Sequence, residues 1–317
     1  MSGGLKVTGL QRSFGSLRAV DGIDLTVEPG QMVGFLGANG AGKTTTMRMI
    51  LGIIQSDAGT VTWNGAPVDA DFRNKIGYMP QERGLYARMQ VHDQVVYFGR
   101  LAGMTKSDAN DRADYWIERV GLTERRDDLV QELSGGNQQR VQLAVSLVHE
   151  PRLMILDEPF AGLDPVAAET MTEIIAERAA DGVGILLSSH QLNLVEGICE
   201  HVVIVSEGRE VAAGRPIDLR SAAPTRTLDV TWAEDVGEWN PLDGELVEFS
   251  GTRALVRLPA LSDMSEQIAH AVGAGDVTML TVEPPSLAEV FAGTVAPTAG
   301  AEQIAASNSD VPAEAVE

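Results

Sequence analysis

The chain has 317 residues and a formal net charge of −21 at pH 7, with 44% hydrophobic and 22% charged residues. This composition is ordinary for a folded protein, so it excludes a fibrous repeat or disorder through most of the chain, and the length suits one large domain and a smaller one. The strong negative charge disfavours a broad electrostatic interaction with nucleic acid or anionic lipid.

The first residues, Met1 to Lys6, lack the basic stretch and apolar run of a secretory signal, and Cys199 is the single cysteine. Both features favour a cytosolic protein, because one cysteine cannot form an internal disulfide. The longest apolar runs, such as 153–156 and 202–205, are far shorter than the roughly 20 residues that span a bilayer. They predict buried strands.

Short β-type runs alternate with helical patterns from residue 5 to about 214, which predicts an α/β domain with a central sheet. Three of these runs end in polar residues. Residues 32–36 lead into a glycine loop, 153–156 end in two carboxylates, and 184–187 end in a Ser-Ser-His segment. Ligands bind at the carboxyl ends of strands in open α/β sheets, so these ends are the candidate site.

The alternating pattern of this 1–214 domain is interrupted once within the domain and ends after it. Helical periodicity replaces the β-type runs between about 82 and 150, which predicts an inserted helical subdomain. The Pro- and Ala-rich segment 215–224 is interpreted as a linker to a small α+β domain at 225–294. That domain's expected elements are strands at 227–232, 254–258 and 277–282 and helices at 264–272 and 286–291. The tail 295–317 has several acids and no bases and is predicted to be disordered.

The glycine loop satisfies the pattern G-x-x-x-x-G-K-[ST] between an apolar run and a helical pattern. Its residues are Gly37, Ala38, Asn39, Gly40, Ala41, Gly42, Lys43 and Thr44, followed by Thr45. Backbone N–H groups of such a loop face a phosphate chain, and the helix that follows adds its positive end. Lys43 is predicted to reach the β- and γ-phosphates, and the Thr44 hydroxyl is predicted to ligate Mg²⁺.

Two carboxylates, Asp157 and Glu158, follow the apolar run 153–156. Beside a phosphate-binding loop, Asp157 is predicted to join the Mg²⁺ shell, and Glu158 is predicted to orient and deprotonate an attacking water.

A second candidate anion site lies at the start of a predicted helix, where Ser134, Gly135 and Gly136 form a capping pattern. One nucleotide cannot obviously use both anion sites of one chain. This suggests that Ser134 serves the nucleotide of a neighbouring chain.

The order of these motifs resembles the ABC ATPase family over about residues 5 to 214. The segment L-S-G-G-N-Q-Q-R at 133–140 is similar to the family signature L-S-G-G-Q, with Asn137 where Gln is commonest. Four further positions match family motifs: Phe14, an aromatic that stacks on adenine; Gln81, the Q-loop; Asp164, the D-loop; and His190, the switch histidine.

The resemblance implies a P-loop NTPase fold, with ATP and Mg²⁺ as cofactors and two chains, most simply two identical ones, that enclose two ATP molecules. Each ATP would lie between Lys43 of one chain and Ser134 of the other. The resemblance also gives Gln81 contact with Mg²⁺ and the attacking water, His190 contact with the γ-phosphate, and Asp164 a role across the dimer interface. Hydrolysis to ADP and phosphate would then open the dimer.

Two runs are similar to the ABC-2-type exporter ATPases, including the sodium and drug efflux group. They are E-R-G-L-Y at 82–86 and E-P-P-S-L-A-E-V-F at 283–291. This resemblance implies a separate membrane-spanning permease that docks near 81–86, with the chain at the cytoplasmic face of the membrane. Two alternatives remain: a non-transport ABC ATPase that acts on ribosomes or nucleic acid, and a catalytically silent regulatory module. The single cassette and the acidic charge disfavour the first, and the presence of Lys43, Glu158 and His190 disfavours the second.

Overall fold

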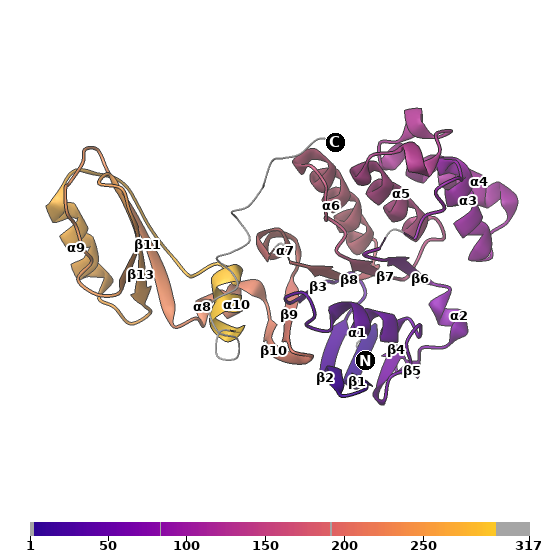
Figure 1. The fold of residues 1–317 in the computed structure, drawn as a ribbon, viewed down its shortest axis with the longest axis horizontal. Helices are drawn as coiled ribbons and strands as arrows, with labels where there is room; N and C mark the ends of the chain where they lie inside the picture. The colour runs from indigo at the N-terminus through magenta and orange to yellow at the C-terminus, as the bar shows by residue number, and fades with distance from the viewer. Residues whose placement is uncertain (1–2, 83, 191, 296–317) are drawn as a thin grey trace, which may run out of the picture. The chain divides into compact units, whose positions relative to one another are not determined.

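The computed structural model describes residues 3–82, 84–190 and 192–295. The chain forms two compact units that divide between Pro216 and Ile217, and Figure 1 labels the elements of both. In the described residues, no helix combines the length and the apolar character needed to cross a bilayer.

The first sheet of unit 1 is antiparallel and has the order β2-β1-β4-β5. Its strands are β1 (Leu5–Phe14), β2 (Leu17–Val27), β4 (Ala58–Trp63) and β5 (Ala66–Pro67). Val7 and its cross-strand partner Leu25 are buried. Side chains alternate between the two faces of a strand, so these two paired residues lie on the same face of the sheet. That face packs into a core that also contains Phe35 and Met47 from other elements of unit 1.

The second sheet of unit 1 has the order β10-β9-β3-β8-β7-β6 and is parallel except for β10. Its strands are β3 (Met32–Leu36), β6 (Ile76–Met79), β7 (Leu153–Asp157), β8 (Gly184–Ser189), β9 (His201–Ser206) and β10 (Arg209–Gly214). Every residue of β7 and β8 is buried. Such fully buried strands are typical of the centre of a parallel sheet covered on both faces.

The helices of unit 1 fall into two groups. Between β6 and β7, where the sequence predicts an inserted helical subdomain, α3 (Val91–Leu101) packs against α4 (Lys106–Arg119) and α5 (Gly135–Leu147), as Figure 1 shows. The remaining helices are α1 (Lys43–Ile50), α2 (Ala70–Arg73), α6 (Pro165–Ala180) and α7 (Leu192–Ile198). Two short 3-10 helices, η1 (Thr123–Arg125) and η2 (Val130–Glu132), lie between α4 and α5.

Helix α4 shows how the local sequence sets an element's bounds. The Thr105 hydroxyl accepts a hydrogen bond from the backbone N–H of Asp108 at 3.2 Å, which satisfies a donor that the first turn leaves unpaired. The buried residues recur at the helical spacing i, i+4, i+7 and i+8, and they are Ala109, Ala113, Trp116 and Ile117. This stripe is the face by which an amphipathic helix packs on its neighbours.

The strand order β3-β8-β7 places the three candidate segments together. Because these neighbouring strands are parallel, their carboxyl ends lie at one edge of the sheet. The glycine loop follows β3, Glu158 follows β7, and His190 follows β8. The sheet therefore brings three segments that are far apart in the sequence to one place.

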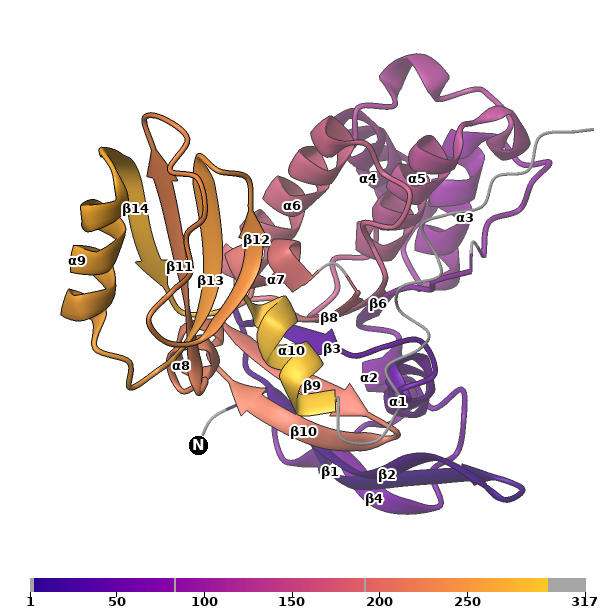
Figure 2. The ribbon, with the colours of Figure 1, turned by 60° about the vertical axis from the view of Figure 1, so that its left-hand side comes forward.

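Unit 2 is an antiparallel sheet with one long helix against it, as Figure 2 shows. The sheet order is β12-β13-β11-β14, and the elements are β11 (Thr225–Trp232), β12 (Glu245–Phe249), β13 (Arg253–Pro259), α9 (Met264–Ala274) and β14 (Val277–Glu283). Trp232 donates its indole N–H to the carbonyl oxygen of Ala271 at 2.9 Å. The core between helix and sheet also includes Leu228, Val230 and Val256.

Three features of the C-terminal region differ from the sequence predictions. The predicted linker at 215–224 contains helix α8 (Pro216–Ser221), whose Arg220 donates to the carbonyl oxygen of Pro285 at 2.9 Å. Strand β12 was not predicted, because its sequence E-L-V-E-F lacks a clear apolar face and pairing with β13 supplies its structure. Helix α10 (Leu287–Val295) ends later than expected, and the tail predicted to be disordered lies, beyond Val295, outside the described residues.

Candidate functional site

The glycine loop is held by two close backbone approaches. A Cβ added to Gly37 would lie 2.4 Å from the carbonyl oxygen of Val205, and one added to Gly42 would lie 2.5 Å from that of Ala19. Gly42 also has a φ of +99°, a conformation that other residues rarely adopt. Both glycines are therefore required for the loop to lie against its neighbours, while Asn39 and Gly40 at its tip are exposed.

Lys43 is almost fully buried and lies between the loop and the acidic residues. Its Nζ donates to the carbonyl oxygens of Gly37 at 2.7 Å and Ala38 at 3.2 Å, and it lies 3.9 Å from Oε1 of Glu158. Burial lowers the pKa of the Lys43 ammonium, and the charges of Glu158 and Asp157 partly oppose this shift. A bound phosphate chain would bring further negative charge to this buried cation.

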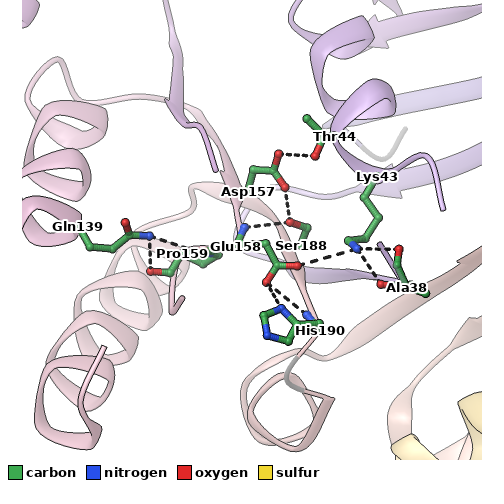
Figure 3. Close-up of polar contacts among 10 residues, drawn as sticks. Ala38, Lys43, Thr44, Gln139, Asp157, Glu158, Pro159, Ser188 and His190 are labelled. Carbon is green, nitrogen blue, oxygen red and sulfur yellow. Dashed lines mark hydrogen bonds and ion pairs between the residues drawn. The ribbon is translucent and has the colours of Figure 1, made fainter. Parts of the chain in front are cut away.

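Hydroxyl groups hold both oxygens of the Asp157 carboxylate. Thr44 Oγ1 donates to Asp157 Oδ2 at 2.7 Å, and Ser188 Oγ donates to Asp157 Oδ1 at 2.6 Å, as Figure 3 shows. Asp157 has no exposed surface. Its orientation is therefore fixed from two sides, by α1 and by β8.

Glu158 is in contact with His190 at the side of the cluster that faces solvent. His190 Nδ1 lies 2.8 Å from Glu158 Oε2, and the backbone N–H of His190 donates to the same oxygen at 3.3 Å. The His190 side chain is 58% exposed, whereas that of Glu158 is 6% exposed. The carboxylate of Glu158 thus contacts the Lys43 ammonium at one oxygen and the solvent-exposed His190 imidazole at the other.

The pair formed by Thr44 and Asp157 fits a magnesium ion. One hydroxyl and one carboxylate lie within 2.7 Å of each other at the loop, and Mg²⁺ is usually bound by one or two carboxylates together with substrate phosphates and water. No cluster of three or more histidine, cysteine or acidic side chains that could hold a metal was found in the described parts of the chain. The donor set therefore suits an ion that arrives with a phosphate ligand.

The signature and D-loop residues lie against each other within the chain. Ser134 caps α5, where its hydroxyl accepts from the backbone N–H of Asn137 at 3.3 Å. A Cβ on Gly136 would lie 3.5 Å from Cδ2 of Leu163. Asp164 caps α6 by accepting from the backbone N–H of Ala167 at 2.8 Å. Ser134 and Asp164 are both exposed, and the adjoining Gly135 and Gly136 are half-buried.

Four of the predicted residues stand apart from the cluster around Glu158. Across the described ranges, no hydrogen bond or ion pair joins Phe14, Gln81, Ser134 or Asp164 to Lys43, Thr44, Asp157, Glu158 or His190. Phe14 is 45% exposed at the end of β1, and the Arg12 guanidinium lies 4.8 Å above its ring. Gln81 is exposed after β6, and Thr45 is half-buried in α1.

Two residues that the sequence did not single out belong to the site. Ser188 contacts both Asp157 and Glu158. Gln139, which is 3% exposed, donates from Nε2 to the carbonyl oxygens of Glu158 at 3.2 Å and Pro159 at 3.0 Å. Ser188 could have been noticed because it ends an apolar run two residues before His190, but Gln139 carried no such signal.

A cavity of about 310 Å³ lies between the second sheet and the helices α3 and α5. Its lining is mostly apolar and includes Tyr78, Leu85, Phe98, Leu101 and Val145. Tyr86 is half exposed beside it and contacts the rings of Tyr97 and Phe98. An apolar cavity with exposed aromatic side chains at its edge is typical of a binding surface.

The chain is similar in sequence to known proteins. Residues 20–161 match the protein family described as ABC transporter. The chain is 40% identical over 289 residues to YhaQ, an ABC transporter ATP-binding protein of Bacillus subtilis strain 168, across 90% of this chain and 97% of the relative. It is 34% identical over 220 residues to LnrL, the linearmycin resistance ATP-binding protein of the same organism, across 68% of this chain and 71% of that relative.

The fold is similar to a solved structure of the ATP-binding subunit of an ABC transporter. The TM-score is 0.63 with 31% sequence identity, across 68% of this chain and 92% of the other. This likeness, together with the mixed α/β sheet and the glycine loop, confirms the predicted fold class of a P-loop NTPase.

Proposed function

This chain belongs to the family of ABC transporter ATP-binding proteins, and we propose that it binds and hydrolyses ATP to drive export through a separate membrane-spanning subunit. Membership of this ATPase family implies ATP binding and hydrolysis. The observation that carries the catalytic part is the convergence of Lys43, Glu158 and His190 at one sheet edge, with Glu158 in contact with both partners.

Each residue of the cluster has a proposed role in the reaction. Lys43 binds the β- and γ-phosphates, and His190 leaves Glu158 to contact the γ-phosphate. Glu158 orients the attacking water and accepts its proton at a carboxylate oxygen. Thr44 and Asp157, with Gln81, would hold Mg²⁺, which supplies positive charge that stabilises negative charge on the phosphate oxygens.

The second anion site supports a dimer. Ser134 is exposed at the start of α5, and no hydrogen bond or ion pair between described residues joins it to the cluster around Lys43. We place each ATP between Lys43 of one chain and Ser134 of a second copy, with Phe14 against adenine and Asp164 at the interface. Such an arrangement is isologous and closes as a dimer, because each chain offers the same two surfaces.

The cavity between the sheet and α3 supports a partner subunit. Its apolar lining and the exposed Tyr86 and Tyr97 suit a short segment of a membrane-spanning chain. The region adjoins 81–86, where the resemblance places the docking site, although Arg83 lies outside the described residues. The name of the relative LnrL, a resistance ATP-binding protein, favours export as the direction. We place the chain at the cytoplasmic face of the membrane.

The catalytic role of Glu158 is tested by Glu158→Gln. Because the amide cannot accept the water's proton, we expect hydrolysis to fall by at least about 100-fold while ATP binding persists. We also expect an ATP-bound dimer that size-exclusion chromatography resolves from the monomer.

Glu150→Gln is the matched control. Glu150 precedes β7 as Glu158 follows it, and the two share a positive φ, of 54° in each case. Glu150 forms a surface ion pair with Arg112, so its loss should leave turnover unchanged. Normal hydrolysis by Glu158→Gln would remove Glu158 from the catalytic role.

The partner is tested by purifying the chain from detergent-solubilised membranes and identifying the proteins that accompany it. We expect a membrane-spanning subunit. Recovery of ribosomes or nucleic acid in its place would contradict the transport function and favour the non-transport alternative.

A further inference from the structure

We propose that Ser188 is a positioning residue for ATP hydrolysis, whose single hydroxyl group orients Asp157 and Glu158 at the same time. The inference rests on the proposed function, because it assigns Ser188 to the reaction in which those two acids act. Ser188 lies in β8 with no exposed surface, between the two acidic residues in Figure 3.

The hydroxyl group of Ser188 is both a hydrogen-bond donor and a hydrogen-bond acceptor. It donates its one proton to Asp157 Oδ1 at 2.6 Å, and its oxygen accepts the backbone N–H of Glu158 at 2.9 Å. A serine hydroxyl offers one donor and two acceptor lone pairs, so both contacts form without competition. The acceptor of the first bond is a carboxylate, so that bond is charge-assisted and stronger than a hydrogen bond between neutral groups.

The contact with Asp157 fixes the rotation of its carboxylate group. Ser188 occupies Oδ1, so Oδ2 is the oxygen that faces Thr44 at 2.7 Å. Without the Ser188 hydroxyl, Oδ1 would be buried with one fewer donor, and the carboxylate could rotate away from Thr44. The pair proposed to hold Mg²⁺ would then lose its fixed arrangement.

The contact with Glu158 holds a backbone that an L-residue rarely adopts. Glu158 has a φ of 54°, which lies in the left-handed region. The hydrogen bond from its N–H to Ser188 therefore stabilises the turn that aims the Glu158 carboxylate at Lys43 and His190. One side chain thus fixes Asp157, the acid proposed to bind Mg²⁺, through its carboxylate, and Glu158, the proposed catalytic base, through its backbone.

The test compares the full-length wild type with Ser188→Ala, Ser188→Cys and a matched control. Ser188→Ala deletes the hydroxyl, and Ser188→Cys keeps a similar volume with a much weaker donor. The control is Ser146→Ala, because Ser146 is also buried but donates at 2.8 Å to Leu143 of its own helix. The measurements are kcat and KM for ATP with Mg²⁺, ATP binding with and without Mg²⁺, and the melting temperature.

We expect Ser188→Ala to lower kcat by about 10- to 100-fold, the range that corresponds to a lost hydrogen bond to a charged group. ATP binding without Mg²⁺ should remain at the wild-type level, whereas the effect of Mg²⁺ on ATP binding should be reduced. Ser188→Cys should also lower kcat and reduce the effect of Mg²⁺ on ATP binding, and Ser146→Ala should match the wild type in both. A role in stability alone would move the melting temperature without this dependence on Mg²⁺.

A folded Ser188→Ala or Ser188→Cys protein with wild-type kcat and a wild-type Mg²⁺ effect would overturn the inference. An equal loss of kcat in Ser146→Ala would do the same, because it would show that any buried hydroxyl matters. Should Ser188→Ala fail to fold, Ser188→Cys decides the question. A wild type that did not hydrolyse ATP would contradict the proposed function, and the Mg²⁺ dependence of ATP binding would still test Ser188.

Discussion

At the scale of single residues, burial sets the chemistry of two groups in unit 1. Lys43 is a buried cation whose pKa is lowered by desolvation, yet it lies beside the carboxylate of Glu158. His149 is mostly buried, and its Nε2 lies 3.3 Å from the carbonyl oxygen of Ile76. Burial lowers the pKa of His149 below its usual value, and the carbonyl oxygen partly opposes the shift.

This pKa shift predicts a loss of stability in acid. The unfolded chain protonates His149 near its usual pKa of about 6.5, whereas the folded chain does so only at lower pH. As the pH falls below about 6.5, the unfolded state binds the proton first and the free energy of unfolding decreases. The contribution is fully present above that pH and is lost as the pH falls toward the folded pKa.

His149→Gln should therefore lose less stability than the wild type between about pH 7 and pH 5. The measurement is urea unfolding of both proteins at several pH values. Above about pH 7.5 the two stability curves should run parallel, because His149 is then neutral in both states. Parallel curves through the acid range as well would contradict the assignment.

At the scale of elements, helix α5 is hydrogen-bonded directly to the turn that carries Glu158. The helix begins at the Ser134 cap, and one turn later Gln139 donates to the backbone carbonyl oxygens of Glu158 and Pro159. A change at the exposed start of α5 can therefore reach the backbone of Glu158 through a single side chain. This contact gives a physical route between the start of α5 and Glu158.

Gln139→Leu should weaken both stability and turnover. It removes two hydrogen bonds and leaves two carbonyl oxygens without this partner, which costs about 1–3 kcal/mol of the free energy of unfolding. We expect turnover to fall by about tenfold, because the turn that carries Glu158 loses one of its supports. Denaturant unfolding and steady-state ATP hydrolysis are the measurements.

Gln138→Leu is the control for that variant. Gln138 also donates to two backbone carbonyl oxygens, those of Val130 and Leu133, each at 3.1 Å. Its loss should reduce stability to a similar degree with a smaller effect on turnover. Equal losses of turnover in the two variants would show that stability alone explains the result for Gln139.

At the scale of the whole molecule, the proposed dimer requires that each active site combine two chains. A Lys43→Ala chain lacks the first half of the site and a Ser134→Ala chain lacks the second. A mixed dimer of the two variants retains one intact pair, in which Lys43 comes from one chain and Ser134 from the other. Each variant alone forms no intact site.

We therefore expect each variant alone to be inactive and an equimolar mixture to recover activity. If the two sites act independently, recovery should approach about a quarter of the wild-type rate, because half of the dimers are mixed and each has one intact site. Steady-state ATP hydrolysis across a series of mixing ratios tests this expectation. A mixture with no activity at any ratio would contradict the shared site.

Several features could be predicted from the sequence because their chemistry is local. The glycine loop places Gly42, Lys43 and Thr44 next to one another, so the phosphate-binding geometry follows from neighbouring residues and the strand before them. The acids at 157–158 were recognised for the same reason. The helix at 216–221 and strand β12 were missed, because a contact with Pro285 and pairing with β13 support them.

Only the tertiary structure decided how the site is held together. Asp157 and Ser188 are 31 positions apart, Glu158 and His190 are 32 apart, and Gln139 and Glu158 are 19 apart. These residues meet because β7 and β8 pair in parallel and α5 packs against β6, the neighbour of β7 in the sheet. A serine in an apolar strand and a glutamine in a helix have no chemical signature of their own, so their roles follow from which backbone and which carboxylate the fold places opposite them.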